Sequence, residues 1–366
     1  MIYDGYRREA FAFRRVTWPG FQEAEDYQMF TGGSISLSAL SELRAQGSLE
    51  FAGESLPDEH DLVRVYYRFT DELGETAQFA LGTFFLNVGD PTYEGGEVSG
   101  SVDLESVLRV ALKGKYGRYY TVKAGTNAVS KASQIIESLG LRTNKPASSY
   151  RLARDVVYEP DQCWLDIVND LLGMAGYASA WPDAYGVVQM APYVEPTARE
   201  PSWLFDDGER SIMLPEVVVT DNTEDTVNAV RLTYQTEEES LWAAAINNDR
   251  NSEASIACKG YEVTHTETVS ELAGDTKAER QENLKAKART MLMDKSSGVE
   301  HVKWRHPWVP LVPNDAAGID YLMASLNWRG AITSQEIDIG DHCEVESDAR
   351  RFIRSGFEIT EECGAW

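Results

Sequence analysis

Residues 161–192 read DQCWLDIVNDLLGMAGYASAWPDAYGVVQMAP, a stretch that predicts one helix followed by one β-hairpin. Asp161 suits the N-cap position, because its carboxylate can accept hydrogen bonds from the free amides of the first turn. Gly176 ends such a helix, and residues 177–181 and 187–190 then form short strands around a turn-forming Pro-Asp-Ala-Tyr-Gly segment. Apolar residues recur at helical spacing within the stretch: Trp164, Leu165, Val168, Leu171, Leu172 and Ala175.

Strand signals lie on both sides of this unit and predict three segments. Residues 1–120 alternate polar and apolar side chains in short runs joined by tight turns, which is typical of a β-sandwich or small barrel. A second helix, capped by Thr126 and ended by Gly140, joins the opening stretch in a small α+β module over residues 121–195. Residues 196–366 return to strands.

The last segment carries one long helix among its strands. Thr276 and Glu279 form a capping box at the start of that helix. Residues 255–266 and 351–359 are rich in strand-forming side chains and are predicted strands. The acidic, polar run 235–253 is predicted to be a mobile loop, because it offers little to bury.

Composition limits the class of protein. A chain of 366 residues with 43% hydrophobic and 25% charged residues is an ordinary globular protein of two or three domains. No apolar run approaches the roughly 18 to 20 residues that span a bilayer, and the N-terminus lacks the pattern of a signal peptide. The formal net charge of −25 argues against binding to nucleic-acid phosphates and against docking on anionic lipid.

The residues that carry chemistry show no organised site. No motif for nucleophilic catalysis, zinc proteolysis, phosphate cradling or dinucleotide binding occurs, so we expect no enzyme, no cofactor and no bound metal. His301 and His306 could ligate a metal, but their odd spacing in a strand points them to opposite faces, which favours structural roles. The cysteines lie far apart and are expected to be free thiols. They are Cys163, Cys258, Cys343 and Cys363.

Aromatic residues leave alternatives open. Trp304 and Trp308 share one face of a predicted strand, so they could stack on a sugar ring or pack in the core; core packing is the favoured interpretation. Nine Trp and seventeen Tyr suit a carbohydrate-binding or adhesin-like β protein of a phage or cell surface. An enzyme with a dispersed acidic site is a further alternative, because 59 acids always offer carboxylate pairs, although none stands out.

Six segments, in their order along the chain, carry a resemblance to a known family. They are GSISL at 33–37 with its continuation to 51, ALGTFFLNV at 80–88, VSGSVDL at 98–104, WLDIVNDLL at 164–172, ASAWPDAYGVV at 178–188 and DIGDHCEV at 338–345. In this order they resemble the tail hub proteins of long-tailed bacteriophages. That family is related to the contractile-phage baseplate hub and to the N-terminal part of siphophage tail-associated proteins. Residues 234–253 and 313–330 depart from the family pattern.

The resemblance implies a mainly β fold with an α+β insertion, in which two tail-tube-like β-barrels flank the small α+β module. It implies a structural homotrimer that forms a ring, joins the tail tube to the tip and lines the DNA channel. Implied neighbours are the distal tail protein or tail tube, the tape-measure protein, and receptor-binding or tip proteins. DNA would pass without specific binding. The protein would be made in the host cytoplasm and reside in the virion tail.

The negative charge has a use in such a channel, since a repulsive wall keeps DNA from sticking during ejection. Strands of the two expected barrels would then direct acidic side chains toward the lumen. The candidate lumen-facing acids are Glu50, Glu97, Asp103, Glu262, Glu267, Asp338 and Glu344.

Overall fold

The computed structural model describes residues 7–144, 146–194, 199–221, 224–236, 239–269, 272, 276–295, 298–353 and 358–365. The chain divides into two compact units. The first comprises Met1–Val217 and Lys303–Ala349, and the second comprises Val218–Val302 and Arg350–Trp366. Of the predicted strand 351–359, residues 354–357 lie outside the described ranges.

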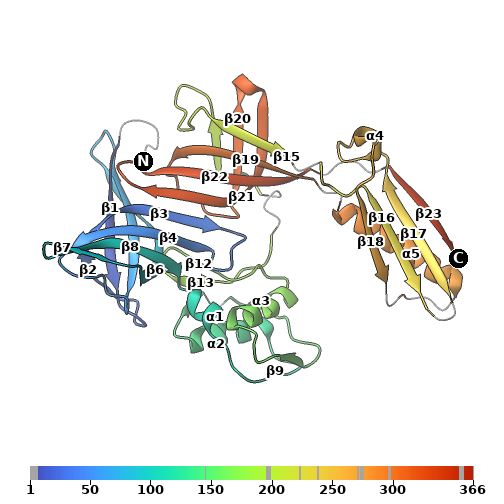
Figure 1. The fold of residues 1–366 in the computed structure, drawn as a ribbon, viewed down its shortest axis with the longest axis horizontal. Coiled ribbons are helices and arrows are strands. Elements are labelled where there is room, and N and C mark those ends of the chain that lie inside the picture. The colour runs from blue at the N-terminus through green and yellow to red at the C-terminus, as the bar shows by residue number, and fades with distance from the viewer. Residues whose placement is uncertain are drawn as a thin grey trace. The chain divides into compact units, whose positions relative to one another are not determined.

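A large open sheet dominates the first unit (Figure 1). The strands of the sheet follow the order β15-β19-β22-β21-β3-β4-β8-β6-β5-β1-β2. The N-terminal strands are β1 (Arg8–Val16), β2 (Glu23–Tyr27), β3 (Phe30–Ser38), β4 (Ala45–Gly53), β5 (Leu62–Thr70), β6 (Thr76–Val88), β7 (Thr92–Glu94) and β8 (Glu97–Ser106). Their alternating sequences bury one set of side chains, so the apolar set forms a core. Fully buried members include Ile35, Leu49, Tyr67, Phe84 and Val102.

Strands from the last third of the chain complete this sheet. β21 pairs antiparallel with β3, with Ile337 opposite Ile35, and both side chains enter the same core. β20 pairs with β21 and also holds β14 as a parallel neighbour. These elements are β14 (Trp203–Asp206), β19 (Gly298–Pro307), β20 (Ala316–Tyr321), the 3-10 turn η2 (Leu322–Ala324), β21 (Leu326–Ile339) and β22 (Glu344–Ile353).

The α+β module is present and packs two helices on each other around one core. Its elements are α1 (Arg109–Lys113), β9 (Tyr120–Val122), α2 (Ala128–Ser138), β10 (Arg142–Thr143), β11 (Val156–Tyr158), α3 (Trp164–Met174), β12 (Trp181–Pro182) and β13 (Val187–Gln189). β12 and β13 form the predicted hairpin. Gly140 and Gly176 follow their helices with φ of 82° and 73°, the left-handed conformation that favours glycine.

The helix caps differ from the prediction by one or two residues. Asn127, rather than Thr126, accepts from the Ser130 amide at the start of α2. At α3 the cap is Cys163, rather than Asp161, because its sulfur accepts from the Asp166 amide while the Asp166 carboxylate accepts from the Cys163 amide. Several neighbouring side chains carry an acceptor that could cap the helix. The residue at which the backbone enters the first helical turn is the one that does so.

The apolar stripe of α3 is buried as predicted, apart from its two end residues Trp164 and Ala175, which are partly buried. Val168, Leu171 and Leu172 have no exposed area and lie in the core of the module. Trp164 is half-buried and stacks edge-on against Tyr116 and Tyr120, with ring centroids 5.5 and 5.2 Å away. The beginning of α3 therefore packs against Tyr120 of β9 and against Tyr116, which lies between α1 and β9.

The second unit is a four-stranded sheet with one long helix on one face (Figure 1). Its strands are β15 (Val217–Asp221), which lies outside the four-stranded sheet, β16 (Ala229–Gln235), β17 (Ser240–Asn247), β18 (Thr264–Val269) and β23 (Ile359–Ala365). The helices are α4 (Ile256–Lys259) and α5 (Lys277–Lys295). Thr276 and Glu279 form the predicted capping box of α5 through reciprocal hydrogen bonds. Leu284, Ala288 and Leu292 bury its apolar stripe against the sheet.

Two sequence predictions in this unit are wrong. The run 235–253 contains strand β17, whose Leu241, Ala243 and Ala245 face the core, so it is not a mobile loop. Acidic residues on its N-terminal side concealed this alternation. The predicted strand 255–266 instead begins with the short helix α4, which Ser255 caps, and becomes β18 only at Thr264.

The mainly β class with an α+β insertion is confirmed. Among the described residues no sheet closes on itself, so the two β-barrels are not confirmed for the single chain. The three-segment division at 120/121 and 195/196 stays a prediction. Within the described ranges, no helix combines the length and the apolar character that crossing a membrane requires.

Candidate functional site

Three predicted acids lie on one face of the large sheet. Glu50 in β4, Asp103 in β8 and Asp338 in β21 are exposed, and each stands between residues buried in the core. The strand register links them across the sheet: Ser34 lies opposite both Asp338 and Ser48, and Ser48 lies opposite Asp103. Because side chains alternate along a strand, all three carboxylates point to the same outer face.

Strand β22 extends this face with further acids. Glu344 and Glu346 flank the buried Val345 and therefore point outward. They border an open hollow of about 610 Å³. Its lining consists of Ser34, Arg305, Glu336, Asp338, Asp341, His342, Glu344 and Glu346. We call the carboxylates of Glu50, Asp103, Glu336, Asp338, Glu344 and Glu346 the acidic face.

Among the described residues, the cations that pair with the acidic face lie at one edge of it. Arg305 forms ion pairs with Glu344 at 3.0 Å and Glu216 at 3.2 Å, and the hydrogen bond from its guanidinium to Glu344 raises the pKa of Arg305. Lys303 lies 3.7 Å from Glu346. Small serine side chains fill the space between the remaining acids. Within the described residues, no cluster of His, Cys, Asp and Glu side chains is arranged to hold a metal ion.

The other predicted acids lie elsewhere. Glu97 is exposed at the turn between β7 and β8. Glu262 and Glu267 belong to the second unit. Glu262 pairs with Arg231 at 2.7 Å, whereas Glu267 shares with Val269 the side of β18 that packs toward α5. The lumen assignment of all seven acids stays a prediction.

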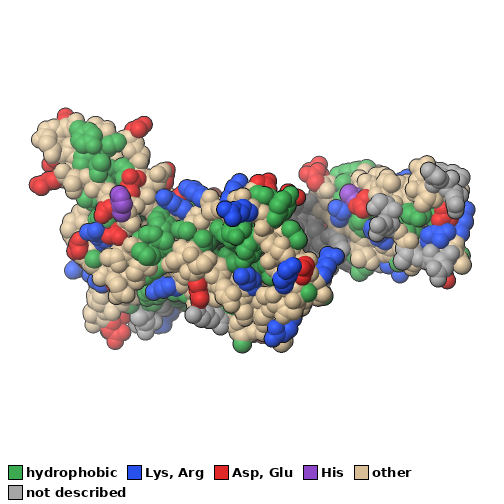
Figure 2. Space-filling view, turned by 90° about the horizontal axis from the view of Figure 1, so that it is seen from below, with side chains coloured by type: hydrophobic (Ala, Val, Ile, Leu, Met, Phe, Trp, Pro, Cys, Tyr) green, Lys and Arg blue, Asp and Glu red, His purple; other side chains and the backbone are tan. Residues whose placement is uncertain are grey.

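The charge of the chain is distributed unevenly. No Asp or Glu occurs between Glu105 and Glu137, a stretch that contains six basic residues. They are Arg109, Lys113, Lys115, Arg118, Lys123 and Lys131. On the face seen in Figure 2, Lys and Arg side chains gather near the middle of the view among hydrophobic ones. The acidic residues are thus concentrated on particular surfaces, of which the acidic face is one.

The alternatives for Trp304, Trp308 and His306 resolve in favour of the core, whereas His301 is only partly buried and its structural role stays a prediction. Trp304 and Trp308 are 1% and 7% exposed, so they cannot form a sugar-stacking platform on the surface. His306 is fully buried, and its ring nitrogens bond the Pro307 carbonyl and the Ser347 hydroxyl at 2.9 Å. Burial lowers the pKa of His306 to about 4, which keeps the imidazole neutral. All four cysteines are free thiols, as predicted.

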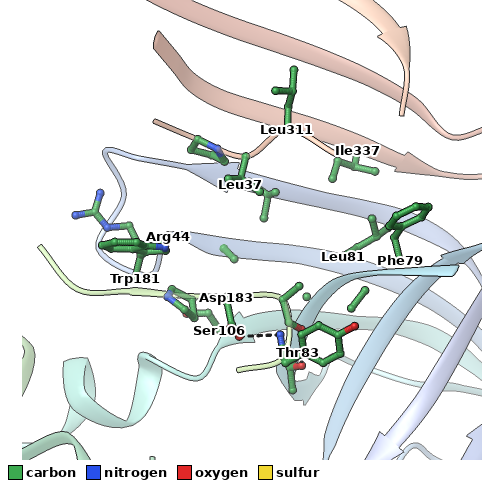
Figure 3. Close-up of a pocket in the computed structure, with 18 of the residues that line it drawn as sticks. Leu37, Arg44, Phe79, Leu81, Thr83, Ser106, Trp181, Asp183, Leu311 and Ile337 are labelled. Carbon is green, nitrogen blue, oxygen red and sulfur yellow. Dashed lines mark hydrogen bonds between the residues drawn. The ribbon is translucent and has the colours of Figure 1, made fainter. Parts of the chain in front are cut away.

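An apolar pocket of the first unit was not predicted from the sequence. It has a volume of about 360 Å³ and lies between β6, the β12–β13 hairpin and the loop 308–314 (Figure 3). Phe79 and Leu81 line one side, Arg44 and Trp181 the other. We call it the Trp181 pocket. Its walls come from segments more than a hundred residues apart, so no local pattern could indicate it.

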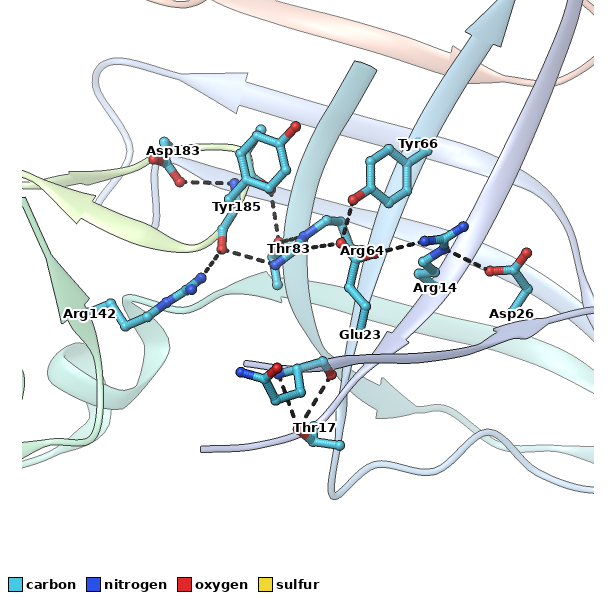
Figure 4. A network of polar contacts seen from close by, with 12 residues as sticks. Arg14, Thr17, Glu23, Asp26, Arg64, Tyr66, Thr83, Arg142, Asp183 and Tyr185 are labelled. Carbon is cyan, nitrogen blue, oxygen red and sulfur yellow. Dashed lines mark hydrogen bonds and ion pairs between the residues drawn. The ribbon is translucent and has the colours of Figure 1, made fainter. Parts of the chain in front are cut away.

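A network of polar contacts anchors the hairpin of the α+β module on the sheet (Figure 4). Arg64 is 4% exposed and donates hydrogen bonds to the Thr83 hydroxyl at 2.8 Å, the Tyr185 carbonyl at 3.1 Å and the Glu23 carboxylate. Burial tends to raise the pKa of Glu23, but hydrogen bonds from Tyr66 and the two arginines it contacts outweigh burial and lower that pKa.

Sequence comparison finds no matching protein family, and no curated protein matches the chain. Solved structures do match. The tail protein from Neisseria meningitidis MC58 has a TM-score of 0.60 at 10% identity, covering 93% of this chain and 97% of that one. The 43 kDa tail protein of prophage MuSo2 from Shewanella oneidensis has a TM-score of 0.61 at 11% identity, with the same coverage.

A chain of the Francisella PdpA–VgrG complex, in its half-lidded form, has a TM-score of 0.57 at 9% identity. The match covers 96% of this chain and 59% of that one. These likenesses extend over nearly the whole sequence, and they include both compact units. The chain therefore has the fold of phage tail proteins and of VgrG-containing assemblies, which confirms at the level of fold the resemblance to the tail hub family.

Proposed function

We propose that this protein is a structural hub of a phage-type tail tip, located in the virion tail. The observation that carries the proposal is the fold likeness to two tail proteins over 97% of their lengths. At 10 and 11% identity the likeness is one of fold, so the structural task is proposed by analogy with those tail proteins. We propose a structural rather than an enzymatic role.

We further propose that three copies form a ring around a channel. The large sheet ends in edge strands β2 on one side and β15, the neighbour of β19, on the other. Copies placed side by side could close such sheets into barrel-like walls only in the assembly. β2 carries Glu23, Glu25 and Asp26, charges that discourage uncontrolled edge pairing. The ring would join the tail tube or distal tail protein to tip proteins and seat the tape-measure protein.

The acidic face is the surface we assign to the channel wall. Carboxylates without a cationic neighbour repel a polyanion within about a Debye length, roughly 8 Å at physiological salt. Serines between them offer no apolar surface for bases to stack on. DNA would therefore pass during ejection without binding. The carbohydrate-binding alternative loses support, because its tryptophan pair is buried.

The test is the mass and shape of the purified protein, alone and with a tail partner. Light scattering after size exclusion should give about three chains per particle, and micrographs should show rings with a central opening. A protein that stays monomeric inside an assembled tail contradicts the proposal. A monomer that binds glycans supports the adhesin alternative.

A further inference from the structure

The Trp181 pocket has the size and character of a binding site. Its volume of about 360 Å³ lies within the usual range for ligand pockets. Apolar side chains from three separate segments line it, among them Phe79, Trp181 and Leu311. In Figure 3, Leu311 and Ile337 lie above the pocket and Thr83 below it, with Phe79 and Leu81 on one side.

The backbone around the pocket is shaped by an irregularity in β6. Val65 pairs with Gly82 and Tyr66 pairs with Ala80, so Leu81 is an extra residue that bulges from the ladder. Bulges of this kind redirect side chains and occur preferentially at functional sites. A Cβ on Gly82 would lie 2.3 Å from the Phe84 ring, so only glycine fits beside the bulge.

Arg44 gives the pocket a cation without a partner. No described residue forms a hydrogen bond or ion pair with its guanidinium, and burial lowers the pKa of Arg44. Its backbone adopts a φ of 61°, an unfavourable conformation for a non-glycine residue. Asn314, with a φ of 72°, lines the same pocket. Unfavourable backbone conformations of this kind cluster at binding and active sites.

Several other polar groups of the wall already have partners. The Thr83 hydroxyl donates to the Ala184 carbonyl at 2.8 Å, and the Ser106 hydroxyl donates to the Leu43 carbonyl. Asp183 accepts from the Tyr185 and Val187 amides and from Gln189. A ligand therefore meets an apolar cavity and one available charged donor. A carboxylate attached to an apolar group satisfies both.

We propose that the Trp181 pocket receives an apolar side chain of a partner protein, whose neighbouring carboxylate pairs with Arg44. Charge complementarity selects this occupant, because Arg44 is the one cation in the lining and no described residue pairs with its guanidinium. That the occupant is a protein segment rests on the proposed structural role, since a tail component works by binding other proteins. The anchor-and-carboxylate pairing itself rests on the pocket alone. A buried anchor of this kind typically dominates the affinity of an interface.

Two matched peptides test the proposal on the full-length protein: Ac-Ala-Phe-Glu-Ala-amide and its isostere Ac-Ala-Phe-Gln-Ala-amide. Ligand-observed NMR titration gives the Kd of each. The glutamate peptide should bind about five- to tenfold more tightly, the range expected for one half-buried charge-assisted contact. Arg44→Gln should abolish this ratio, whereas Arg154→Gln, an exposed control that removes the same charge, should preserve it. Trp181→Ala should weaken both peptides.

Thermal unfolding of each variant establishes that it is folded before its affinity is compared. Equal affinity of the wild type for both peptides overturns the proposal, and so does binding of neither. An unchanged ratio in Arg44→Gln overturns it as well. The outcome is independent of ring formation. A protein that discriminates the peptides but stays monomeric supports the pocket proposal and contradicts the hub proposal. A ring that does not discriminate the peptides supports the hub proposal and contradicts the pocket proposal.

Discussion

Arg64 connects the sheet to the α+β module, and its replacement by methionine should loosen that connection. Methionine keeps the buried aliphatic volume and removes the guanidinium. Three contacts are lost: those to the Thr83 hydroxyl, the Tyr185 carbonyl and the Glu23 carboxylate. The change therefore tests the polar network of Figure 4 rather than the packing of the sheet.

The expected cost follows from what the partners retain. Glu23 keeps Arg14 at 2.8 Å and Tyr66 at 2.5 Å, and its side chain is 30% exposed. The Tyr185 carbonyl keeps a hydrogen bond from Arg142 at 2.6 Å. No group is left wholly without a partner, so the loss is smaller than the 3 to 5 kcal/mol typical of a broken buried pair. We expect about 2 to 3 kcal/mol, or about 1 kcal/mol per contact.

Urea unfolding followed by tryptophan fluorescence measures the loss, and hydrogen exchange locates it. Amides of residues 177–190 should exchange faster in Arg64→Met, because the hairpin loses its anchor. Arg68→Met is the matched control: it lies on the same strand, is exposed and bonds only Gln78, so it should cost less than about 0.5 kcal/mol. Equal effects of the two substitutions would refute the reasoning.

Three further predictions follow from buried or charged residues. Leu171→Ala, at a fully buried position of α3, should lower the free energy of unfolding by about 2 to 5 kcal/mol in the same urea assay. His306 has a pKa of about 4 in the folded protein against an ordinary 6.5, so the unfolded chain binds the proton first as pH falls. The free energy of unfolding should therefore decrease as pH drops from 6.5 toward 4. His306→Gln should reduce this pH dependence in acid titrations of unfolding. Asp338→Lys combined with Glu50→Lys should leave thermal stability nearly unchanged, since both are exposed, but should make the assembled protein retain double-stranded DNA at low salt in a filter-binding assay.

The parts of the fold that the sequence predicts are the local ones. The stripe of α3, its terminating Gly176 and the capping box at Thr276 each depend on residues within a few positions. Helical spacing and glycine conformation act at that range, so a single sequence reveals them. The caps at Asn127 and Cys163 were misplaced because several neighbouring residues have suitable acceptors.

What the sequence did not predict depends on distant residues meeting. β21 pairs with β3 although the two strands lie some three hundred residues apart in the sequence, and no local pattern near Ile35 or Ile337 predicts that pairing. The same holds for Arg64, whose carbonyl partner at Tyr185 belongs to another segment, and for the Trp181 pocket. For the acidic face, alternation placed Glu50, Asp103 and Asp338 outward, whereas their side-by-side arrangement followed only from the register.

The central claim is that copies of this chain form a ring whose channel the acidic face lines. An electron cryo-microscopy structure of the assembled protein, with the electrostatic potential of its lumen mapped, tests this most directly. The account predicts threefold symmetry, with Glu50, Asp103 and Asp338 on the wall and a negative lumen. A ring with these carboxylates on its outside, around a neutral or basic channel, would contradict it.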